Sequence, residues 1–487
     1  MSDEVIVAID QRVERKQACY AAVSDRIWEY AETGYHEHRS AALLSELLEA
    51  EGFEVQRGAA GIDTAIIASF SNCNYADEGN KHPVIAMLGE YDALSGLSQQ
   101  AGVAIEQAIE RGGNGHGCGH HLLGVGSLAA AVVLKDMMLE LDLAGTVRFY
   151  GCPAEENGYG KAFMVREGCF DDVDAAFCWH PYSMNAVVHA SSLAVLQAVF
   201  KFHGTAAHAA SAPHLGRSAL DAVELMNIGA NYMREHMIDS ARVHYAITNT
   251  GGLSPNVVQP EAEVAYLVRA PESAQAAELF ERLINIAKGA ALMSGTTLEY
   301  QLEGACANLI PNTTLETVLN DQLMRFGPPM YSEEEYIFAA KMYAALEPSV
   351  RSEYASSLSV EQGKQLADRP IAGFIAPYTD GKIFATGAST DVGDVSWKVP
   401  TAQLFAATWA WSTPLHTWQA VAQGQSSIAH KGMLLAAKSM AAAATALLLN
   451  PELIEHAKDE LNSRLAGRAY VSLLPPQEQL FFRRDGL

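Results

Sequence analysis

The sequence predicts an α/β protein: a mixed, mostly parallel sheet with helices on both faces, into which a smaller α+β domain is inserted. Short buried strands such as residues 83–88 and 146–151 alternate with helix-like segments such as 122–141, which is the pattern of a parallel sheet. The strand pattern then changes at about residue 191. With 487 residues, the chain is too long for a single core, so two domains are expected.

The first 70 residues supply helices and edge strands. Residues 21–51 have helical periodicity, interrupted by a turn at Thr33-Gly34, and short strands are expected at 53–55 and 64–70. The amphipathic N-terminus has no basic segment followed by an apolar one, so no secretory signal is expected.

Polar residues follow several buried strands. The sequence GEYDAL comes directly after strand 83–88, Glu155 and Glu156 follow strand 146–151, and His180 follows strand 174–179. Ligands of parallel α/β sheets collect outside the carboxyl ends of the strands. These residues are therefore candidates for one site.

The inserted domain is predicted to span residues 191–308. Its strand-like segments are LAVLQAVFKFHG, VHYAITNTGG and AEVAYLVRAP, and its helix-like segments are 217–237 and 274–294. Residues 1–190 and 309–487 then form the other domain, with a polar, helix-prone stretch at 330–370 and a loop at 387–397.

Charge and cysteine content restrict the class of protein. The chain has 33 Lys and Arg against 57 Asp and Glu, a net charge of −24, which repels nucleic acid and anionic membranes. Seven scattered cysteines favour a reducing compartment, and we expect a cytoplasmic protein. The apolar run Met433–Leu449 carries Lys438 and is too short to span a bilayer; it predicts a buried helix that ends at Asn450-Pro451.

The stretch GNGHGCGHH (113–121) admits three interpretations. Its glycines allow tight bends, so that Cys118 and His120 can converge on one divalent ion such as Zn²⁺. Alternatively, Cys118 is a nucleophile activated by a histidine. In the third interpretation the stretch is a loop with a small buried cysteine and solvent-exposed histidines.

The adjacent carboxylates Glu155 and Glu156 favour the metal interpretation. Neighbouring residues at a strand end point in different directions, so one can bind metal while the other takes a proton from the attacking water. The alternative is a solvated surface pair.

Taken together, these residues resemble those of the M20 family of metal-dependent peptidases and amidohydrolases, in the branch with a GHxCGH loop. The resemblance runs nearly end to end, and the motifs that carry it are LGEYDALSGLSQQAG (88–102), NGHGCGHHLLG (114–124), VRFYGCPAEENG (147–158), AAHAASAPHLGRSALDAV (206–223), STDVGDVSWKVP (389–400) and TPLHTWQ (413–419).

The resemblance implies a centre of two divalent ions, Mn²⁺ or Zn²⁺. It assigns as metal ligands Cys118, His120, Glu156, His180 and His416. It also implies that Glu155 is the general base and that Asp92 is a supporting carboxylate near the metal, which would fix the orientation and basicity of a ligand.

The resemblance also implies a ferredoxin-like inserted domain that acts as a lid and dimerisation domain. His208 would reach the active site of the partner protomer and stabilise the oxyanion, while Asn256 and Arg269 would hold the substrate, Arg269 through its carboxylate. The alternatives are that His208 caps a turn before Pro213, that Arg269 forms an ion pair at a strand end, and that Asn256 is a turn residue.

The expected function is hydrolysis of the amide bond of an N-acyl amino acid, foremost p-aminobenzoyl-glutamate, in a homodimer or together with a different, homologous chain. Other acyl-amino acids, amino acid conjugates or β-alanyl dipeptides are alternative substrates, and a catalytically silent binding protein is a third possibility. One departure from the family pattern is His121, where related sequences have Asn or Asp. His116 and His214 do not occupy ligand positions of the family.

Overall fold

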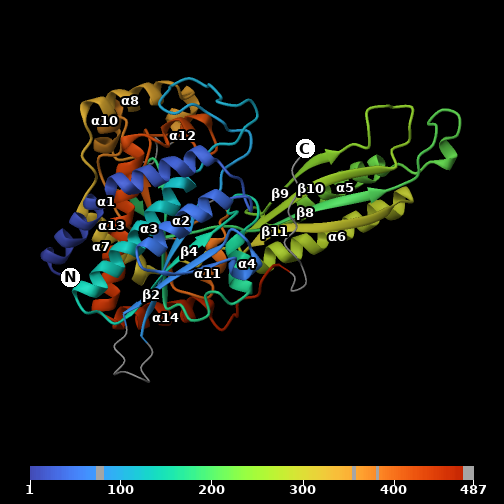
Figure 1. Ribbon diagram of the computed structural model, residues 1–487. Coiled ribbons are helices and arrows are strands. Elements are labelled where there is room, and N and C mark those ends of the chain that lie inside the picture. The colour runs from blue at the N-terminus through green and yellow to red at the C-terminus, as the bar shows by residue number, and fades with distance from the viewer. Residues whose placement is uncertain (73–81, 354–357, 380–382, 386, 475–487) are drawn as a thin grey trace. The chain divides into compact units, whose positions relative to one another are not determined.

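The structure is a computed structural model that describes residues 1–72, 82–353, 358–379, 383–385 and 387–474 (Figure 1). Contacts divide the chain into two compact units. Unit 1 comprises Met1–Ala190, Ile310–Phe384 and Val395–Ala469. Unit 2 comprises Ser191–Leu309, Ala385–Asp394 and the described residues after Ala469.

Unit 1 is built on a seven-stranded mixed sheet of order β1-β2-β4-β3-β5-β13-β6. Its strands are β1 (Glu54–Arg57), β2 (Ile66–Asn72), β3 (Val84–Glu90), β4 (Gly145–Cys152), β5 (Ala175–Tyr182), β6 (Ala186–Val187) and β13 (Thr401–Ala407). The four central strands, β4, β3, β5 and β13, pair in parallel, and β1, β2 and β6 pair antiparallel at the edges. The α/β prediction is confirmed.

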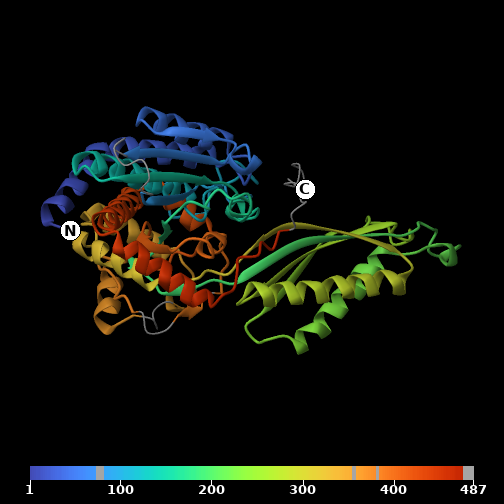
Figure 2. The ribbon, with the colours of Figure 1, turned by 90° about the horizontal axis from the view of Figure 1, so that it is seen from below.

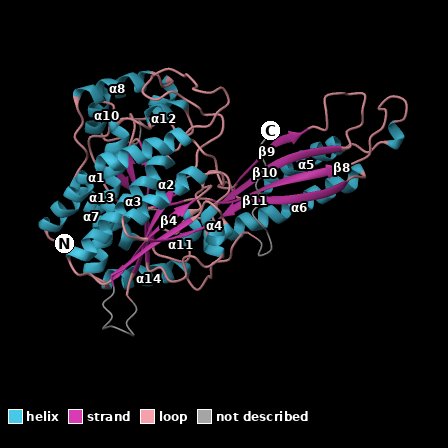
Figure 3. Ribbon diagram, viewed as in Figure 1, coloured by secondary structure: helices cyan, strands magenta, loops and turns pink. Residues whose placement is uncertain are grey.

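The helices of unit 1 surround this sheet (Figure 3). They are α1 (Asp3–Tyr30), α2 (His38–Ala50), α3 (His120–Glu140), α4 (Gly160–Arg166), α7 (Thr313–Phe326), α8 (Glu333–Ala344), α9 (Pro348–Glu353), α10 (Val360–Asp368), α12 (Trp418–Gln423), α13 (Ser427–Leu449) and α14 (Glu452–Leu465). Helices α3 and α13 pack against each other; α3 contacts β3, β4 and β5, and α13 contacts β5 and β13.

Helix α1 is longer at its N-terminus than the sequence pattern predicted. It begins at Asp3 rather than near residue 21. Its buried residues Ile9, Val13 and Tyr20 lie on one face, because spacings of four and seven residues return to the same side of a helix. The charged residues between them lie on the other faces of the helix. They interrupt the apolar pattern of the sequence, which therefore predicts no helix before residue 21.

Helices α3 and α13 are each long and apolar enough to cross a membrane, but 89% and 83% of their most apolar windows are buried inside the fold. Such a composition is equally expected of core helices. The predicted buried helix before Asn450-Pro451 is confirmed as α13, and its Lys438 Nζ lies 2.7 Å from Asp10 Oδ1.

Unit 2 contains a four-stranded antiparallel sheet of order β11-β8-β10-β9. Its strands are β8 (Ala194–His203), β9 (Arg242–Asn249), β10 (Glu261–Ala270) and β11 (Thr297–Cys306). Helices α5 (Ala219–Met233) and α6 (Ser273–Ser294) pack side by side on one face, as Figure 2 shows. The remaining short elements are β7 (Ala190–Ser191), β12 (Phe384–Ala385), α11 (Val392–Ser396) and the 3₁₀ helices η1 (Ala59–Gly61), η2 (Pro213–Leu215) and η3 (Arg234–His236).

Close packing of α3 on the sheet generates a prediction. A Cβ on Gly126 would lie 2.8 Å from the Trp179 indole, whereas one on Gly289 of α6 would have no atom within 4 Å. We expect Gly126→Ala to lower the free energy of unfolding by about 1 to 3 kcal/mol through overpacking. Gly289→Ala should leave it unchanged or raise it by about 1 kcal/mol, because alanine favours helices. Urea unfolding followed by circular dichroism would measure both, and equal effects would contradict this description of the core.

Candidate metal centre

The candidate site lies at one edge of the central sheet. Glu90 is the last residue of β3, Asp92 follows it, and Glu155 and Glu156 follow β4. His180 lies near the end of β5. Because β3 pairs in parallel with both β4 and β5, their carboxyl ends meet.

The glycine-rich loop is packed tightly against this edge. Gly119 is the N-cap of α3 and has a φ of 81°, and a Cβ there would lie 2.8 Å from Trp409 and 2.9 Å from Pro181. Only glycine combines this backbone conformation with this close approach. The stretch 113–121 is therefore a fixed support for Cys118 and His120, both of which are buried, rather than an exposed loop.

Five side chains assigned as metal ligands from the sequence come together around the Cys118 sulfur. The Sγ lies 3.4 Å from His180 Nε2. Ligand atoms lie within 4.8 Å of one another in two groups that share this cysteine, namely Cys118, His120 and His180, and Cys118, Glu156 and His416. The residues thus supply nitrogen, sulfur and oxygen donors to one small volume.

Asp92 orients His120. Its Oδ1 lies 2.7 Å from His120 Nδ1, and its Oδ2 accepts a hydrogen bond of 2.9 Å from the Glu156 amide. With Nδ1 donating to the carboxylate, the lone pair of His120 Nε2 is directed into the cluster. A carboxylate that holds a ligand histidine in this way raises its basicity.

His180 and His416 are also held by backbone contacts. His180 Nδ1 lies 2.8 Å from the Pro181 carbonyl oxygen, which leaves Nε2 for the cluster. His416 adopts a left-handed φ of 60°, donates its amide to the Gly117 carbonyl oxygen at 2.9 Å, and places Nε2 3.2 Å from Glu156 Oε2. This amide contact ties a residue distant in sequence to the glycine-rich loop.

These residues fit a divalent metal. Buried His120 Nε2 and Glu156 Oε1 have no hydrogen-bond partner among the described residues, and both face the cluster.

Burial and the nearby Glu156 raise the pKa of the Cys118 thiol well above its usual value, so a thiolate here requires a cation beside it. The same shift disfavours Cys118 as a free nucleophile. Thiolate and imidazole donors together suit Zn²⁺ or a similar ion.

Two buried charged residues of this edge were missed from the sequence. Glu90 is 3% exposed and Lys161 is fully buried, with 2.5 Å between Lys161 Nζ and Glu90 Oε1. The other oxygen, Glu90 Oε2, lies 3.3 Å from His120 Nε2. Burial alone would raise the pKa of Glu90, but Lys161 and His120 outweigh it and hold the pKa below its usual value. The available signal was a glutamate that ends an otherwise apolar strand.

Glu155 lies beside the same cluster. Its carboxylate, Glu90 and His120 form a third group whose ligand atoms lie within 4.8 Å of one another. Glu155 is only partly buried, so it borders the cluster on a side that solvent reaches. This position suits a group that exchanges protons with water.

His208 and Asn256 lie close together in unit 2. His208 is exposed, its Nδ1 accepts hydrogen bonds of 3.2 Å from the amides of Ala210 and Ser211, and the Ala209 amide donates to the Asn256 carbonyl oxygen. His208 therefore caps the turn through its Nδ1, as in the turn-capping interpretation. Its Nε2 carries the proton and can donate a hydrogen bond.

Arg269 lies at the other end of the inserted sheet. It is the ninth of ten residues of β10. His208 bridges to Val257, shortly before that strand begins, and the first residue, Glu261, is roughly 26 Å from Arg269 at about 3.3 Å per residue. The structure does not bring Arg269 together with His208 and Asn256 within one chain. Its Nη1 donates to the Gly387 carbonyl oxygen at 3.3 Å, and it forms no ion pair with any described residue.

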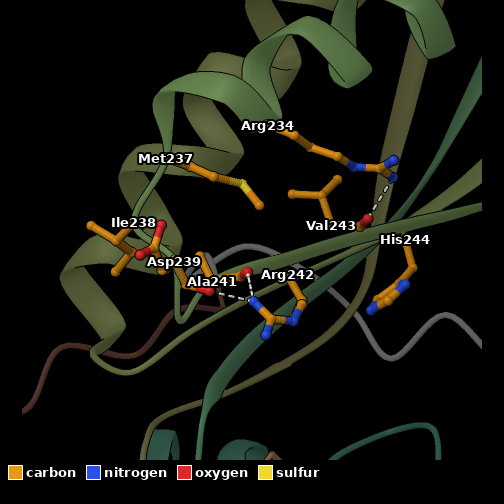
Figure 4. Close-up of a pocket in the computed structure, with 8 residues that line it drawn as sticks. All are labelled: Arg234, Met237, Ile238, Asp239, Ala241, Arg242, Val243 and His244. Carbon is orange, nitrogen blue, oxygen red and sulfur yellow. Dashed lines mark hydrogen bonds between the residues drawn. The ribbon is translucent and has the colours of Figure 1, made fainter.

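Arg269 lies directly opposite Arg242 of β9. Arg242 lines a pocket of about 430 Å³ together with Arg234, Met237, Ile238, Asp239, Ala241, Val243 and His244 (Figure 4). Its Nη1 donates to the carbonyl oxygens of Asp239 and Ala241, and Arg234 Nη2 donates to that of Val243. Like charges directly opposite each other destabilise a sheet, so this arginine pair favours an anion beside it.

Comparison with known proteins agrees with the fold and identifies the family. Residues 86–390 match the family described as Peptidase family M20/M25/M40. The chain is 50% identical to one subunit of the p-aminobenzoyl-glutamate hydrolase of Escherichia coli, covering 94% of this chain and 95% of that protein.

Two further relatives are more distant. Xaa-Arg dipeptidase of Mus musculus is 32% identical over 67% of this chain and 72% of its own length. A different subunit of the same Escherichia coli p-aminobenzoyl-glutamate hydrolase is 28% identical over 58% of this chain and 73% of its own length.

Two solved structures share the fold. An aminobenzoyl-glutamate utilization protein from Klebsiella pneumoniae has a TM-score of 0.58 at 19% identity, covering 87% of this chain and 98% of that one. A dinuclear metal binding peptidase of Bacillus subtilis has a TM-score of 0.54 at 17% identity, covering 90% of this chain and 99% of that one. The match over residues 86–390 and the 50% identity to the Escherichia coli subunit show that the chain belongs to peptidase family M20/M25/M40.

Proposed function

We propose that this protein is a metal-dependent amidohydrolase that cleaves p-aminobenzoyl-glutamate to p-aminobenzoate and glutamate. The observation that carries the proposal is the convergence of Cys118, His120, Glu156, His180 and His416, with Glu155 beside them, in a chain that is 50% identical to a component of a hydrolase of that name. A catalytically silent binding protein would not need this complete set of groups.

The five ligand side chains would hold two divalent ions, Mn²⁺ or Zn²⁺. When bound, such ions polarise an amide carbonyl and lower the pKa of a coordinated water from about 16 towards 7. The mixed nitrogen, sulfur and oxygen donors support this choice of metal.

Glu155 performs the proton transfers of this reaction. It accepts a proton from the attacking water as the C–O bond forms, and then delivers that proton to the amide nitrogen as the C–N bond breaks. Its partly exposed position next to the cluster supports this role. Asp92 keeps His120 in the required tautomer throughout.

Removal of the general base and of the metal should each abolish turnover. We expect Glu155→Gln to lower kcat for p-aminobenzoyl-glutamate by at least about a hundredfold, because proton transfer contributes that much, while metal content stays unchanged. The assay is release of p-aminobenzoate by protein stripped with chelator and reloaded with Mn²⁺ or Zn²⁺. Full activity of the stripped protein, or of the variant, would refute the proposed mechanism.

The arginine pair of unit 2 supports glutamate over other amino acids. Arg242 and Arg269 lie opposite each other on β9 and β10. Neither forms an ion pair with a described residue, although Asp239 lines the same pocket as Arg242. Glutamate bears two carboxylates that this pair would attract, whereas the guanidinium of the arginine released by an Xaa-Arg dipeptidase would be repelled. Because the net charge of −24 gives no long-range attraction for an anion, local cations must bind it.

Arg242 provides a test of substrate choice. We expect Arg242→Gln to lower kcat/KM for p-aminobenzoyl-glutamate by roughly ten- to a hundredfold, the value of a hydrogen bond between charged groups. Turnover of p-aminobenzoyl-glutamine, which lacks the second carboxylate, should change little. Lys201→Gln, at the other end of the same sheet, serves as control because Lys201 pairs with Glu263. Equal losses for both substrates would contradict a role in choosing glutamate.

The proposal includes a homodimer in which His208, with Asn256, serves the active site of the partner protomer. The Escherichia coli hydrolase has a second homologous component, so a different chain of that kind is a further candidate partner. The seven scattered cysteines support a cytoplasmic location.

Mixed dimers test whether His208 acts in the partner. A His208→Ala protomer paired with a Glu155→Gln protomer leaves one complete site per mixed dimer if the histidine acts across the interface. Random re-pairing of equal amounts should then restore about a quarter of wild-type activity in a twofold-symmetric dimer. Each variant alone should be nearly inactive. No recovery after confirmed exchange of protomers would place His208 in the site of its own chain or outside catalysis.

A further inference from the structure

The proposed mechanism leaves the ion pair of Lys161 and Glu90 without a role. Both side chains are nearly or fully buried, and Lys161 Nζ lies 2.5 Å from Glu90 Oε1. Withdrawing two charges from water is costly, so such a pair is a weak source of stability. Its position suggests a different purpose.

Glu90 presents its second oxygen to the metal cluster. Glu90 Oε2 lies 3.3 Å from His120 Nε2, the nitrogen that has no hydrogen-bond partner among the described residues. Glu90, His120 and Glu155 hold their ligand atoms within 4.8 Å of one another. The carboxylate therefore lies where an ion bound by His120 would meet it.

The backbone fixes Glu90 in this position. A Cβ on Gly124 of α3 would lie 2.6 Å from the Glu90 carbonyl oxygen, so the helix packs directly against this residue. Because Lys161 binds one carboxylate oxygen, the other is the one that remains for a cation. Carboxylate oxygens are common ligands of Zn²⁺ and of Mn²⁺.

We propose that Glu90 is an additional carboxylate ligand of the metal centre and that Lys161 is the positioning residue that holds it. The inference rests on the metal dependence of the proposed function. It assigns different consequences to the loss of each partner: loss of Glu90 removes a metal ligand, whereas loss of Lys161 keeps that ligand and removes the ammonium charge that repels metal ions beside it.

The experiment compares metal binding and stability of Glu90→Gln and Lys161→Met. Proteins are stripped with chelator, titrated with Mn²⁺ and Zn²⁺ by calorimetry, and analysed for bound metal by mass spectrometry, with Tm measured in both states. We expect Glu90→Gln to bind metal at least tenfold more weakly and to retain fewer than two ions. Lys161→Met should bind two ions at least as tightly as wild type, while its metal-free Tm falls and metal restores it.

A double variant and a control complete the design. Glu90→Gln combined with Lys161→Met removes both charges, so its metal-free Tm should exceed that of Lys161→Met while metal binding stays weak. This variant also tests the inference if Glu90→Gln alone does not fold. Glu335→Gln breaks a similar pair, Lys431 Nζ to Glu335 Oε2 at 2.6 Å; it should lower Tm and leave metal binding unchanged.

Two outcomes separate this inference from the proposed function. If wild type binds two ions and Glu90→Gln binds them with unchanged affinity, Glu90 is only a structural partner of Lys161 and the inference is wrong. If wild type binds no divalent metal, the proposed function fails and this inference fails with it.

Discussion

The parallel pairing of β3 with both β4 and β5 is the constraint on which the site depends. It brings the ends of three strands to one edge of the sheet, and with them Glu90, Glu155 and His180. The glycine-rich loop then fits against this edge because Gly119 has no side chain to collide with Trp409 and Pro181. A shift of one strand by one residue would turn these side chains to the other face.

Buried charge is the second organising feature of this edge. Asp92 satisfies His120 on one side and the Glu156 amide on the other, and Lys161 satisfies Glu90. The remaining buried atoms, His120 Nε2 and Glu156 Oε1, are the ones that a cation would satisfy. Contacts outside the cluster thus hold its side chains in place, and their inner atoms face the volume that a metal would occupy.

Much of this arrangement could be predicted from the sequence, because strand ends and metal-ligand residue types leave clear local patterns. Cys118, His120 and the pair at 155 and 156 were found in this way, and His416 through family resemblance. Glu90 and Lys161 were missed, since a single charged residue in an apolar segment does not reveal its partner. The sequence pattern predicts α1 only from about residue 21, although the helix begins at Asp3, because charged residues interrupt the apolar residues of its buried face. The pairing of Arg242 with Arg269 depends on strand register, which no local pattern encodes.

The wide spacing of the ligands along the chain bears on biosynthesis. His416 closes the cluster by its contact with the glycine-rich loop, yet it is translated after Cys118 by roughly 15 to 60 s at ribosomal rates of about 5–20 residues per second. During that interval the nascent chain lacks one of the five proposed ligands. Under the proposed function, the complete donor set therefore forms only when nearly the whole chain has been made.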